Sequence, residues 1–237
     1  MSEIDASHTV RAYDGELREL HETIVRMGEL ARDQLADAVD ALARGDGDLA
    51  VRVMANDAKV DESDHAVNEL TVRVLALRSP VADDLRRVIG TLKAAGELER
   101  VADLAVNVAK RTLLLNSLPQ MPAIGGILRM GALVGEMLKD VVHAYDTHDV
   151  GLAEQIWRRD HEVDDQCSAL FRELLTYMLE DPRNITSCSH LMFIGKNIER
   201  AGDHATNIAE VVYYMVKGEP LTGERPKVDT SSFRLEH

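Results

Sequence analysis

Residues 24–30 read IVRMGEL, and residues 127–133 read ILRMGAL, 103 positions further along the chain. Later in each half the offset becomes 100, and ERVADLAVN at 99–107 meets ERAGDHATN at 199–207. Long segments that match in the same order indicate a tandem duplication. The repeated acidic residues are the informative part, because any duplicated core keeps its apolar positions while charges on solvated faces usually drift.

Each half of the sequence predicts three helices. Proline cannot donate a helix hydrogen bond, and the six prolines leave long proline-free segments. In the first segment apolar residues recur every three or four positions from Leu17 to Leu42, which is typical of one buried helix face. The GDGD run at 45–48 ends that helix, and we expect Asp48 to cap the next one. The other five helices are predicted at 48–78, 81–115, 123–146, 149–180 and 182–217.

The predicted fold is therefore all-α, with two tandem three-helix bundles related by the internal repeat. At 1.5 Å per residue a helix of about 30 residues is about 45 Å long, so we expect elongated antiparallel bundles. The first repeat is assigned to residues 1–116, the second to 123–217, and a polar tail to 218–237. Residues 235–237 resemble the junction of a C-terminal histidine tag and are assigned no function.

The charge of the chain excludes several classes of protein. Its 237 residues carry a formal net charge of −14, and no run of Lys and Arg opposes that field. A protein that binds nucleic acid or anionic lipid headgroups directly would need such a basic patch. No apolar stretch approaches the roughly 18 residues of a membrane span, and the N-terminus lacks the apolar segment of a signal peptide. We therefore expect a cytoplasmic protein that neither binds nucleic acid nor inserts into a membrane.

Each half carries two pairs of acidic residues spaced i, i+4, which places both members of a pair on one helix face. Like charges at this spacing destabilise a helix slightly unless a cation neutralises them. If the second and third helices bring two pairs together, the oxygen ligands suit Mg²⁺, Mn²⁺, Ca²⁺ or iron, with Zn²⁺ as a further candidate. Ordinary solvated faces remain the alternative, although repetition at equivalent positions favours cation sites. The predicted ligands are Asp57 with Asp61, Glu99 with Asp103, Asp160 with Asp164, and Glu199 with Asp203.

The surroundings of the pairs on the third helices add to this prediction. Ala and Val are frequent there, so we expect all four of those carboxylates to be at least partly buried, and buried like charges need a partner. Asn107 and Asn207 lie one turn further along the same stripe and are expected to orient the ligands or to coordinate directly. Arg100 and Arg200 follow the motif glutamates, and each either forms a salt bridge between helices or binds an anion or partner.

Familiar catalytic motifs are missing from the sequence. It contains no P-loop, dinucleotide fingerprint, nucleophile elbow, CxxC or HExxH. The E-x-x-H of ferritin-like di-iron bundles must occur on two helices, and the one at Glu62 and His65 has no counterpart in the second half. We therefore expect no enzyme activity. A carboxylate-rich bundle for metal handling, or a metalloenzyme, is the alternative that the acidic pairs leave open.

Residues 79–110 and 180–210 resemble the PhoU family of phosphate-signalling regulators, and the resemblance extends over nearly the whole chain. Its most specific part is the twin E-R-x-x-D-x-x-x-N motif at 99–107 and 199–207. The resemblance implies that the eight acidic residues bind metal clusters, as E(D)-x-x-x-D motifs do in some members of the family. The first motif reads ERVAD where the family usually has ERIGD. The larger side chain of Ala102 is therefore expected to narrow the room for a close contact between helices beside the first site.

The resemblance also implies a function. A PhoU-like protein is expected to be a non-enzymatic negative regulator of the phosphate-starvation response and of phosphate uptake. It would act as an adaptor between the PstB-like ATPase of the phosphate ABC transporter and a PhoR-like sensor histidine kinase. Its expected location is cytoplasmic, peripheral to the inner face of the membrane through these partners. A homodimer is also implied by the resemblance, although no feature of the sequence demands one.

Overall fold

The structure of the chain is a computed structural model that describes residues 3–118 and 121–222, with side chains from residue 12 onward. Within these ranges every regular element is helical, which confirms the all-α prediction. The elements are α1 (Glu3–Arg44), α2 (Gly47–Arg78), α3 (Ala82–Leu115), α4 (Ile124–Thr147), α5 (Val150–Glu180), the short 3₁₀ helix η1 (Pro182–Asn184) and α6 (Ile185–Lys217). Residues 235–237, with their resemblance to a tag junction, lie outside the described residues.

Two helices that follow tight turns begin in the same way. Asp46 has an extended backbone, with φ −82° and ψ 94°, and its Oδ1 accepts a hydrogen bond of 2.9 Å from the N–H of Leu49. Asp149, at the equivalent position, repeats this cap with a bond of 3.0 Å. The prediction of Asp48 as the cap is wrong by two residues. Gly45 adopts a left-handed φ of 65° that ends α1, so α2 begins early enough for Asp46 to cap it.

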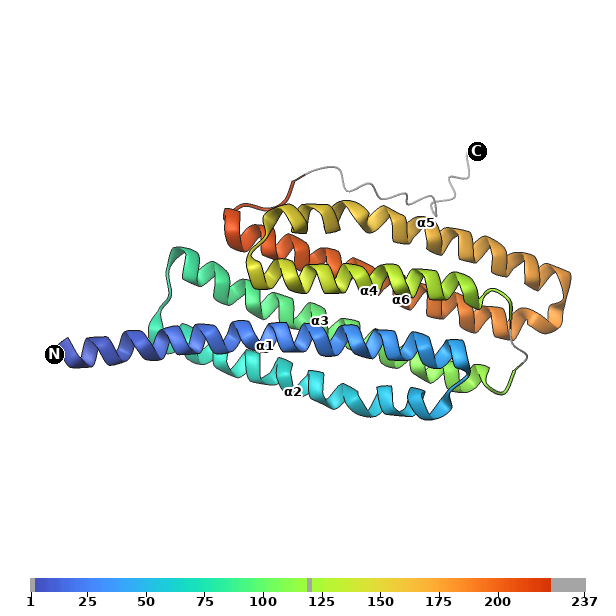
Figure 1. Cartoon of the computed structure of the whole chain (residues 1–237), viewed down its shortest axis with the longest axis horizontal. Helices are drawn as coiled ribbons and strands as arrows, with labels where there is room; N and C mark the ends of the chain where they lie inside the picture. Colours follow the sequence, from blue (N-terminus) through green and yellow to red (C-terminus); the bar gives the residue numbers. More distant parts are fainter. Residues whose placement is uncertain (1–2, 119–120, 223–237) are drawn as a thin grey trace, which may run out of the picture.

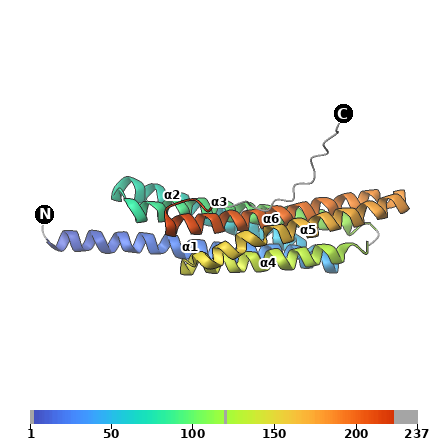
Figure 2. The same cartoon turned by 90° about the horizontal axis from the view of Figure 1, so that it is seen from above.

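Apart from the start of α6, the other predicted helix ends lie within one residue of the observed ones. The helix predicted from Pro182 begins with the single 3₁₀ turn η1, and α6 proper starts at Ile185. At the other end of the chain, α1 already begins at Glu3. Its first turns project beyond the neighbouring helices (Figures 1 and 2). The apolar stripe that starts at Leu17 therefore marks the part of α1 that packs on the rest of the molecule.

The two halves lie side by side along their length (Figure 1). Helix α1 packs on α4 and α3 packs on α6, so these four helices form a centre that both halves share. Among the described residues, α2 and α5 pack only on helices and turns of their own half and flank this centre. The prediction of two three-helix repeats is confirmed, and the shared centre joins them into one body. The boundaries at 116 and 123 stay a prediction.

The contact between α1 and α4 contains the same glycine–valine pair twice, with the glycine once from each half of the chain. A Cβ added to Gly28 of α1 would collide with Val142 of α4, and a Cβ added to Gly131 of α4 would lie 2.9 Å from two methyl carbons of Val39 of α1. The two contacts are equivalent, because 103 positions separate Gly28 from Gly131 and Val39 from Val142. Glycine is needed at both places because the partner valine occupies the space of a side chain.

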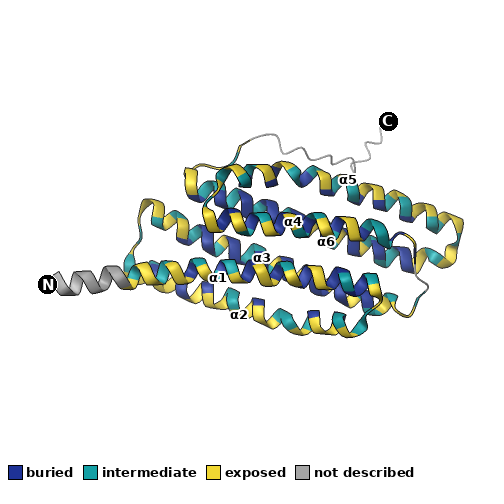
Figure 3. Ribbon diagram, viewed as in Figure 1, coloured by how far each residue is buried: buried dark blue, intermediate teal, exposed yellow. Residues whose placement is uncertain are grey.

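The core is aliphatic and follows the repeat. Met27 and Met130 are fully buried at equivalent positions, as are Leu98 and Ile198 at the offset of 100. Figure 3 shows buried residues on the inward faces of the helices and exposed residues on their outer faces. The shared centre therefore holds the helix faces in register, and this fixes the positions of the acidic pairs relative to one another.

Candidate functional site

The first acidic cluster lies between α2 and α3. It consists of Asp57 and Asp61 on α2 with Glu99 and Asp103 on α3. Burial raises the pKa of Asp57, and the charges of Asp61 and Asp103 add to the shift. Burial is also the main cause of a raised pKa at Glu99, followed by the charges of Asp103 and Asp64. The structure therefore brings carboxylates of the two helices into one electrostatic environment.

The second acidic cluster lies between α5 and α6 and is more deeply set. It consists of Asp160 and Asp164 on α5 with Glu199 and Asp203 on α6. Asp160 is only 4% exposed and accepts a hydrogen bond of 3.2 Å from the Thr206 hydroxyl. Burial raises the pKa of Asp164 to about 6, and the other three carboxylates of the cluster add to the shift. Lys196 forms an ion pair of 2.7 Å with Glu199.

The donor chemistry of the second acidic cluster suits a cation. Glu199 Oε2 is buried and has no hydrogen-bond partner among the described residues, so one carboxylate oxygen is left for an ion. The four carboxylates of the cluster supply oxygen ligands, which hard divalent cations prefer. The nearby thiol of Cys167 would add a softer ligand. Burial raises the pKa of that thiol to about 11. Within residues 3–118 and 121–222, no three His, Cys, Asp or Glu side chains already converge on one point, so binding would require side chains to turn.

The sequence analysis missed two residues beside the first acidic cluster. Gln34 of α1 is buried, and its amide donates hydrogen bonds of 3.0 Å to Asp57 Oδ1 and 3.4 Å to the Val53 carbonyl. A lone polar residue in the apolar stripe of α1 was the available signal. Asp64 lies three residues after Asp61, and burial together with the charge of Asp61 raises its pKa. Its spacing of i, i+3 places it on the same face of α2.

Comparison with known proteins agrees with this architecture. The PhoU domain matches residues 24–112 and, a second time, residues 127–212. The chain belongs to the PhoU family. A phosphate-specific transport system accessory protein PhoU homolog of Caulobacter vibrioides is 48% identical over 226 residues, which cover 95% of this chain and 98% of that protein. A homolog of the same name from Xylella fastidiosa (strain 9a5c) is 43% identical and covers 95% of each chain.

Solved PhoU structures share the fold. The crystal structure of PhoU from Pseudomonas aeruginosa has a TM-score of 0.85 and 36% identity, covering 87% of this chain and 100% of that one. The phosphate transport system regulatory protein PhoU from Streptococcus pneumoniae has a TM-score of 0.80 and 29% identity, covering 89% of this chain and 100% of that one. The paired three-helix repeats of this chain are thus the architecture of the PhoU family.

The asparagines of the twin PhoU motif have unequal surroundings. Asn207 donates a hydrogen bond of 2.9 Å to Glu97 Oε2, and His204 Nδ1 lies 2.7 Å from the same oxygen. These contacts join α6 to α3 and therefore link the two halves. Asn107 is exposed on α3 and forms no hydrogen bond with the described residues through its side chain. The expected role of both asparagines in orienting metal ligands stays a prediction.

The arginines of the PhoU motif, Arg100 and Arg200, are exposed, and neither forms an ion pair with a residue that the structure describes. Their expected roles therefore stay predictions.

Asp103 is also exposed, so the expectation that all four third-helix carboxylates are partly buried is wrong at this position. A Cβ at Gly202, the equivalent of Ala102, would meet Val134 and Val163 at an ordinary 3.5 Å. In the second half, alanine at this motif position would not require a wider helix spacing.

Proposed function

We propose that this PhoU-family chain is a non-enzymatic negative regulator of phosphate uptake and of the phosphate-starvation response. The observation that carries the proposal is the 48% identity, over 95% of the chain, to a protein named as an accessory protein of a phosphate-specific transport system. In the proposed mechanism the chain is an adaptor. It binds the ATPase subunit of a phosphate ABC transporter and a sensor histidine kinase, and keeps the kinase from activating its response regulator when phosphate is plentiful.

The arrangement of the helices supports an adaptor. Helices α2 and α5 each keep one long face that no other described helix covers, so the molecule offers two separate surfaces to two partners. Among the described residues, no helix is long and apolar enough to cross a membrane. We therefore propose a cytoplasmic adaptor that reaches the inner face of the membrane through its transporter partner. Homodimerisation belongs to the same proposal and is measured by light scattering coupled to size-exclusion chromatography.

Deletion of the gene in the bacterium that carries it tests the regulatory role. In phosphate-rich medium the deletion strain is expected to express phosphate-regulated genes, such as one for alkaline phosphatase, at a raised level. A copy of the wild-type gene restores repression and serves as the control. Unchanged expression in the deletion strain contradicts the proposal.

Exposed apolar residues near the ends of the outer helices allow a direct test of the adaptor. Val72 and Leu77 on α2 are 66% and 68% exposed, and Leu175 and Leu179 on α5 are 49% and 85% exposed. Two double variants, Val72→Glu with Leu77→Glu and Leu175→Glu with Leu179→Glu, are tested for binding to the purified ATPase and kinase. Each double variant is expected to lose one partner and keep the other, while Val51→Glu, also on α2, keeps both. Undiminished binding of both partners by both double variants contradicts an adaptor built on these helices.

We further propose that the two acidic clusters bind divalent cations. The buried and unpartnered Glu199 Oε2 supports this for the second acidic cluster. For the first, the support is the raised pKa of Asp57 and of Glu99, to which the charge of Asp103 contributes in both cases. Metal content of protein purified without chelator is measured by elemental analysis for wild type, Asp103→Ala and Asp203→Ala. Each variant is expected to lose the metal of its own cluster alone. A chain that takes up no metal under any condition rules out both this proposal and a metalloenzyme.

A further inference from the structure

A cavity of about 320 Å³ lies between α1, α3, α4 and α6, at the end of the molecule where α1 projects. It is separate from both acidic clusters, which involve α2 and α5. Arg18 of α1 and Arg87 of α3 line it from exposed positions. Tyr145 is buried beneath them, and its hydroxyl shares a hydrogen bond of 2.8 Å with Thr91. The cavity therefore combines a polar, buried end with a cationic opening.

Two histidines and Asp146 also line this cavity, and its other lining residues are apolar: Leu17, Leu20, Val88 and Met215. The ring of His21 stacks on the ring of Tyr145 with 5.2 Å between centroids, and its Nε2 lies 2.9 Å from Asp146 Oδ1. The ring of His148 meets His21 edge-on at 5.8 Å. His148 Nδ1 lies 3.0 Å from the Tyr145 carbonyl, which can only accept, so Nδ1 carries a proton and Nε2 is left for another partner.

The chain has a net charge of −14, so its acidic residues outnumber its basic ones, but the two arginines of this cavity do not pair with any that the structure describes. Neither Arg18 nor Arg87 forms a hydrogen bond or ion pair with the residues that the structure describes. Asp146 is the single acid of the cavity lining, and it already contacts His21. The opening of the cavity therefore carries at least one uncompensated positive charge, and more when His148 is protonated.

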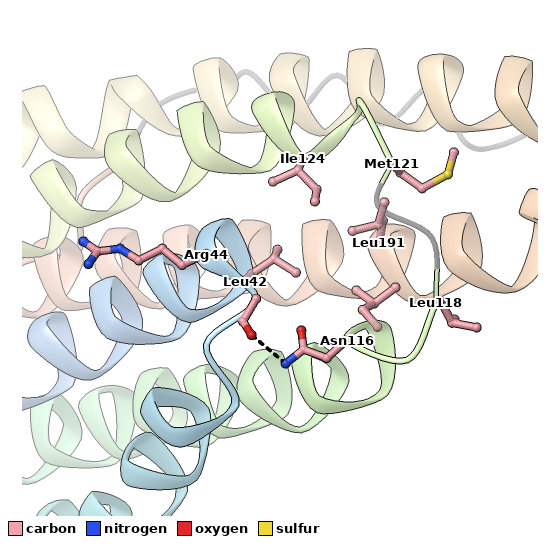
Figure 4. Close-up of a pocket in the computed structure, with 9 residues that line it drawn as sticks. Leu42, Arg44, Asn116, Leu118, Met121, Ile124 and Leu191 are labelled. Carbon is pink, nitrogen blue, oxygen red and sulfur yellow. Dashed lines mark hydrogen bonds between the residues drawn. The ribbon is translucent and has the colours of Figure 1, made fainter.

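The equivalent cavity at the opposite end of the molecule shows that the fold does not require this chemistry. It has a volume of about 210 Å³, and Figure 4 shows Leu42, Ile124, Leu191 and Met121 around it. By the repeat offsets these residues stand where Tyr145, His21, Thr91 and Arg18 stand in the first cavity. Arg44 points away from this group in Figure 4 and forms an ion pair of 2.8 Å with Asp40. Of these two cavities, the one where α1 projects is lined by two arginines, two histidines and the Tyr145 and Thr91 hydroxyls, whereas the other has Arg44 as its one charged lining residue among those that the structure describes.

We propose that this cavity binds a phosphate group, either as inorganic phosphate or as a small phosphate ester. Guanidinium groups match the oxygens of a tetrahedral oxyanion with paired hydrogen bonds, and a protonated His148 Nε2 would donate another. The volume falls at the lower end of the range for small-molecule sites, so it admits an ester as well as the free ion. The chain would then bind phosphate by itself, which goes beyond its proposed role as an adaptor between other proteins.

Binding in this cavity should depend on pH through His148. The charged groups that line the cavity around His148 are Arg18 and His21 from α1, Arg87 from α3, and Asp146 from the last turn of α4, which His148 follows. Helix α6 contributes the uncharged Met215. Burial lowers the pKa of His148, and the charges of Arg87 and His21 lower it further. A bound dianion opposes these effects and favours the protonated ring. Anion binding is therefore coupled to proton uptake and strengthens as the pH falls.

Isothermal titration calorimetry on the full chain tests the proposal. Inorganic phosphate and glycerol 3-phosphate are titrated separately, and saturable binding of either one supports the site and identifies the source of the phosphate group. Arg18→Gln and Arg87→Gln are each expected to weaken that binding about tenfold or more, because each removes a charge-assisted hydrogen bond. Arg44→Gln, at the equivalent cavity, is the matched control and should bind as wild type does.

Sulfate isolates the contribution of His148, since sulfate stays a dianion between about pH 6 and about pH 8, whereas phosphate itself titrates there. Sulfate should bind more tightly at the lower pH, and His148→Gln should remove most of that difference. The proposal is overturned if neither phosphate compound binds, or if both arginine variants bind as well as Arg44→Gln does. These outcomes are independent of the gene-deletion experiment, so an empty cavity and a failed adaptor are distinguishable.

Discussion

The two halves of this molecule repeat one another at the glycine contacts of α1 with α4 and differ clearly at their acidic clusters. The glycine and valine pairs of α1 and α4 repeat residue for residue. The acidic clusters share four carboxylates but not their neighbours. Gln34, Asp64 and Gly96 of the first half are replaced by Met137, Cys167 and Lys196 in the second, and Val106 is replaced by Thr206.

This difference shows which part of a duplicated site is fixed and which part is free to change. In the first acidic cluster the Gln34 amide hydrogen-bonds Asp57 and so opposes the rise in its pKa. In the second, Thr206 donates to Asp160, and Lys196 pairs with Glu199. The carboxylates are retained at equivalent positions, while their hydrogen-bond and ion-pair partners differ between the halves. Two clusters with the same carboxylates can therefore differ in their response to pH and, under the proposal that they bind cations, in metal affinity.

The largest predicted effect concerns the place where the halves agree. Gly28→Ala forces a Cβ into Val142 and is expected to lower the free energy of unfolding by about 2 kcal/mol, within the usual range for overpacking. Gly131→Ala should lower it less, because its Cβ would still lie 2.9 Å from Val39. Denaturant unfolding measures both effects. Val142→Ala in the Gly28→Ala background should restore much of the loss, and a Gly28→Ala variant as stable as wild type would contradict the close contact.

The next effect concerns the place where the halves differ. Folding raises the pKa of Asp164 from 3.8 to about 6, so folding disfavours its charged form. In metal-free protein this carboxylate therefore lowers stability as the pH rises from about 4 to about 6, and the loss is complete above that range. Asp164→Asn is expected to stabilise the metal-free protein at neutral pH by about 1 to 2 kcal/mol, after allowance for solvent screening.

The matched control for Asp164→Asn is Asp61→Asn, at the equivalent and exposed position of α2. It should change stability by less than about 0.5 kcal/mol, as surface substitutions usually do. Thermal unfolding in chelator between about pH 4 and about pH 7 measures both variants. Equal effects of the two substitutions would mean that the second acidic cluster is no more desolvated than the first. Added Mn²⁺ should reverse the order, because wild type then gains stability that Asp164→Asn lacks.

The sequence predicted the helices well because their signals are local. Proline positions and apolar spacing depend on neighbours along the chain, and the repeat doubled every such signal. The cap at Asp46 was misplaced because a run that reads GDGD offers two aspartates with equal capping chemistry. Only the left-handed backbone of Gly45 decides between them.

The shared centre and the surroundings of the acidic clusters could not be predicted in the same way. Packing of α1 on α4 depends on the contact of Gly28 with Val142, more than 100 residues away in the sequence. No local sequence pattern predicts that contact. Gln34 reaches Asp57 from a different helix, so its role appears only when both helices are placed. The carboxylates themselves were visible because the duplication repeated them. What the sequence could not supply was the set of groups that surrounds them.

The smallest predicted effect tests whether the halves are equal where their local geometry is equal. Asp46 and Asp149 have φ values of −82° and −81°, and they accept from Leu49 and Leu152 at 2.9 and 3.0 Å. Replacement of either by alanine should lower the free energy of unfolding by about 1 kcal/mol, the usual loss for a helix cap. The sites lie far apart, so the double variant should lose the sum. A clear difference between the two single variants would show that divergence of the halves extends to their helix ends.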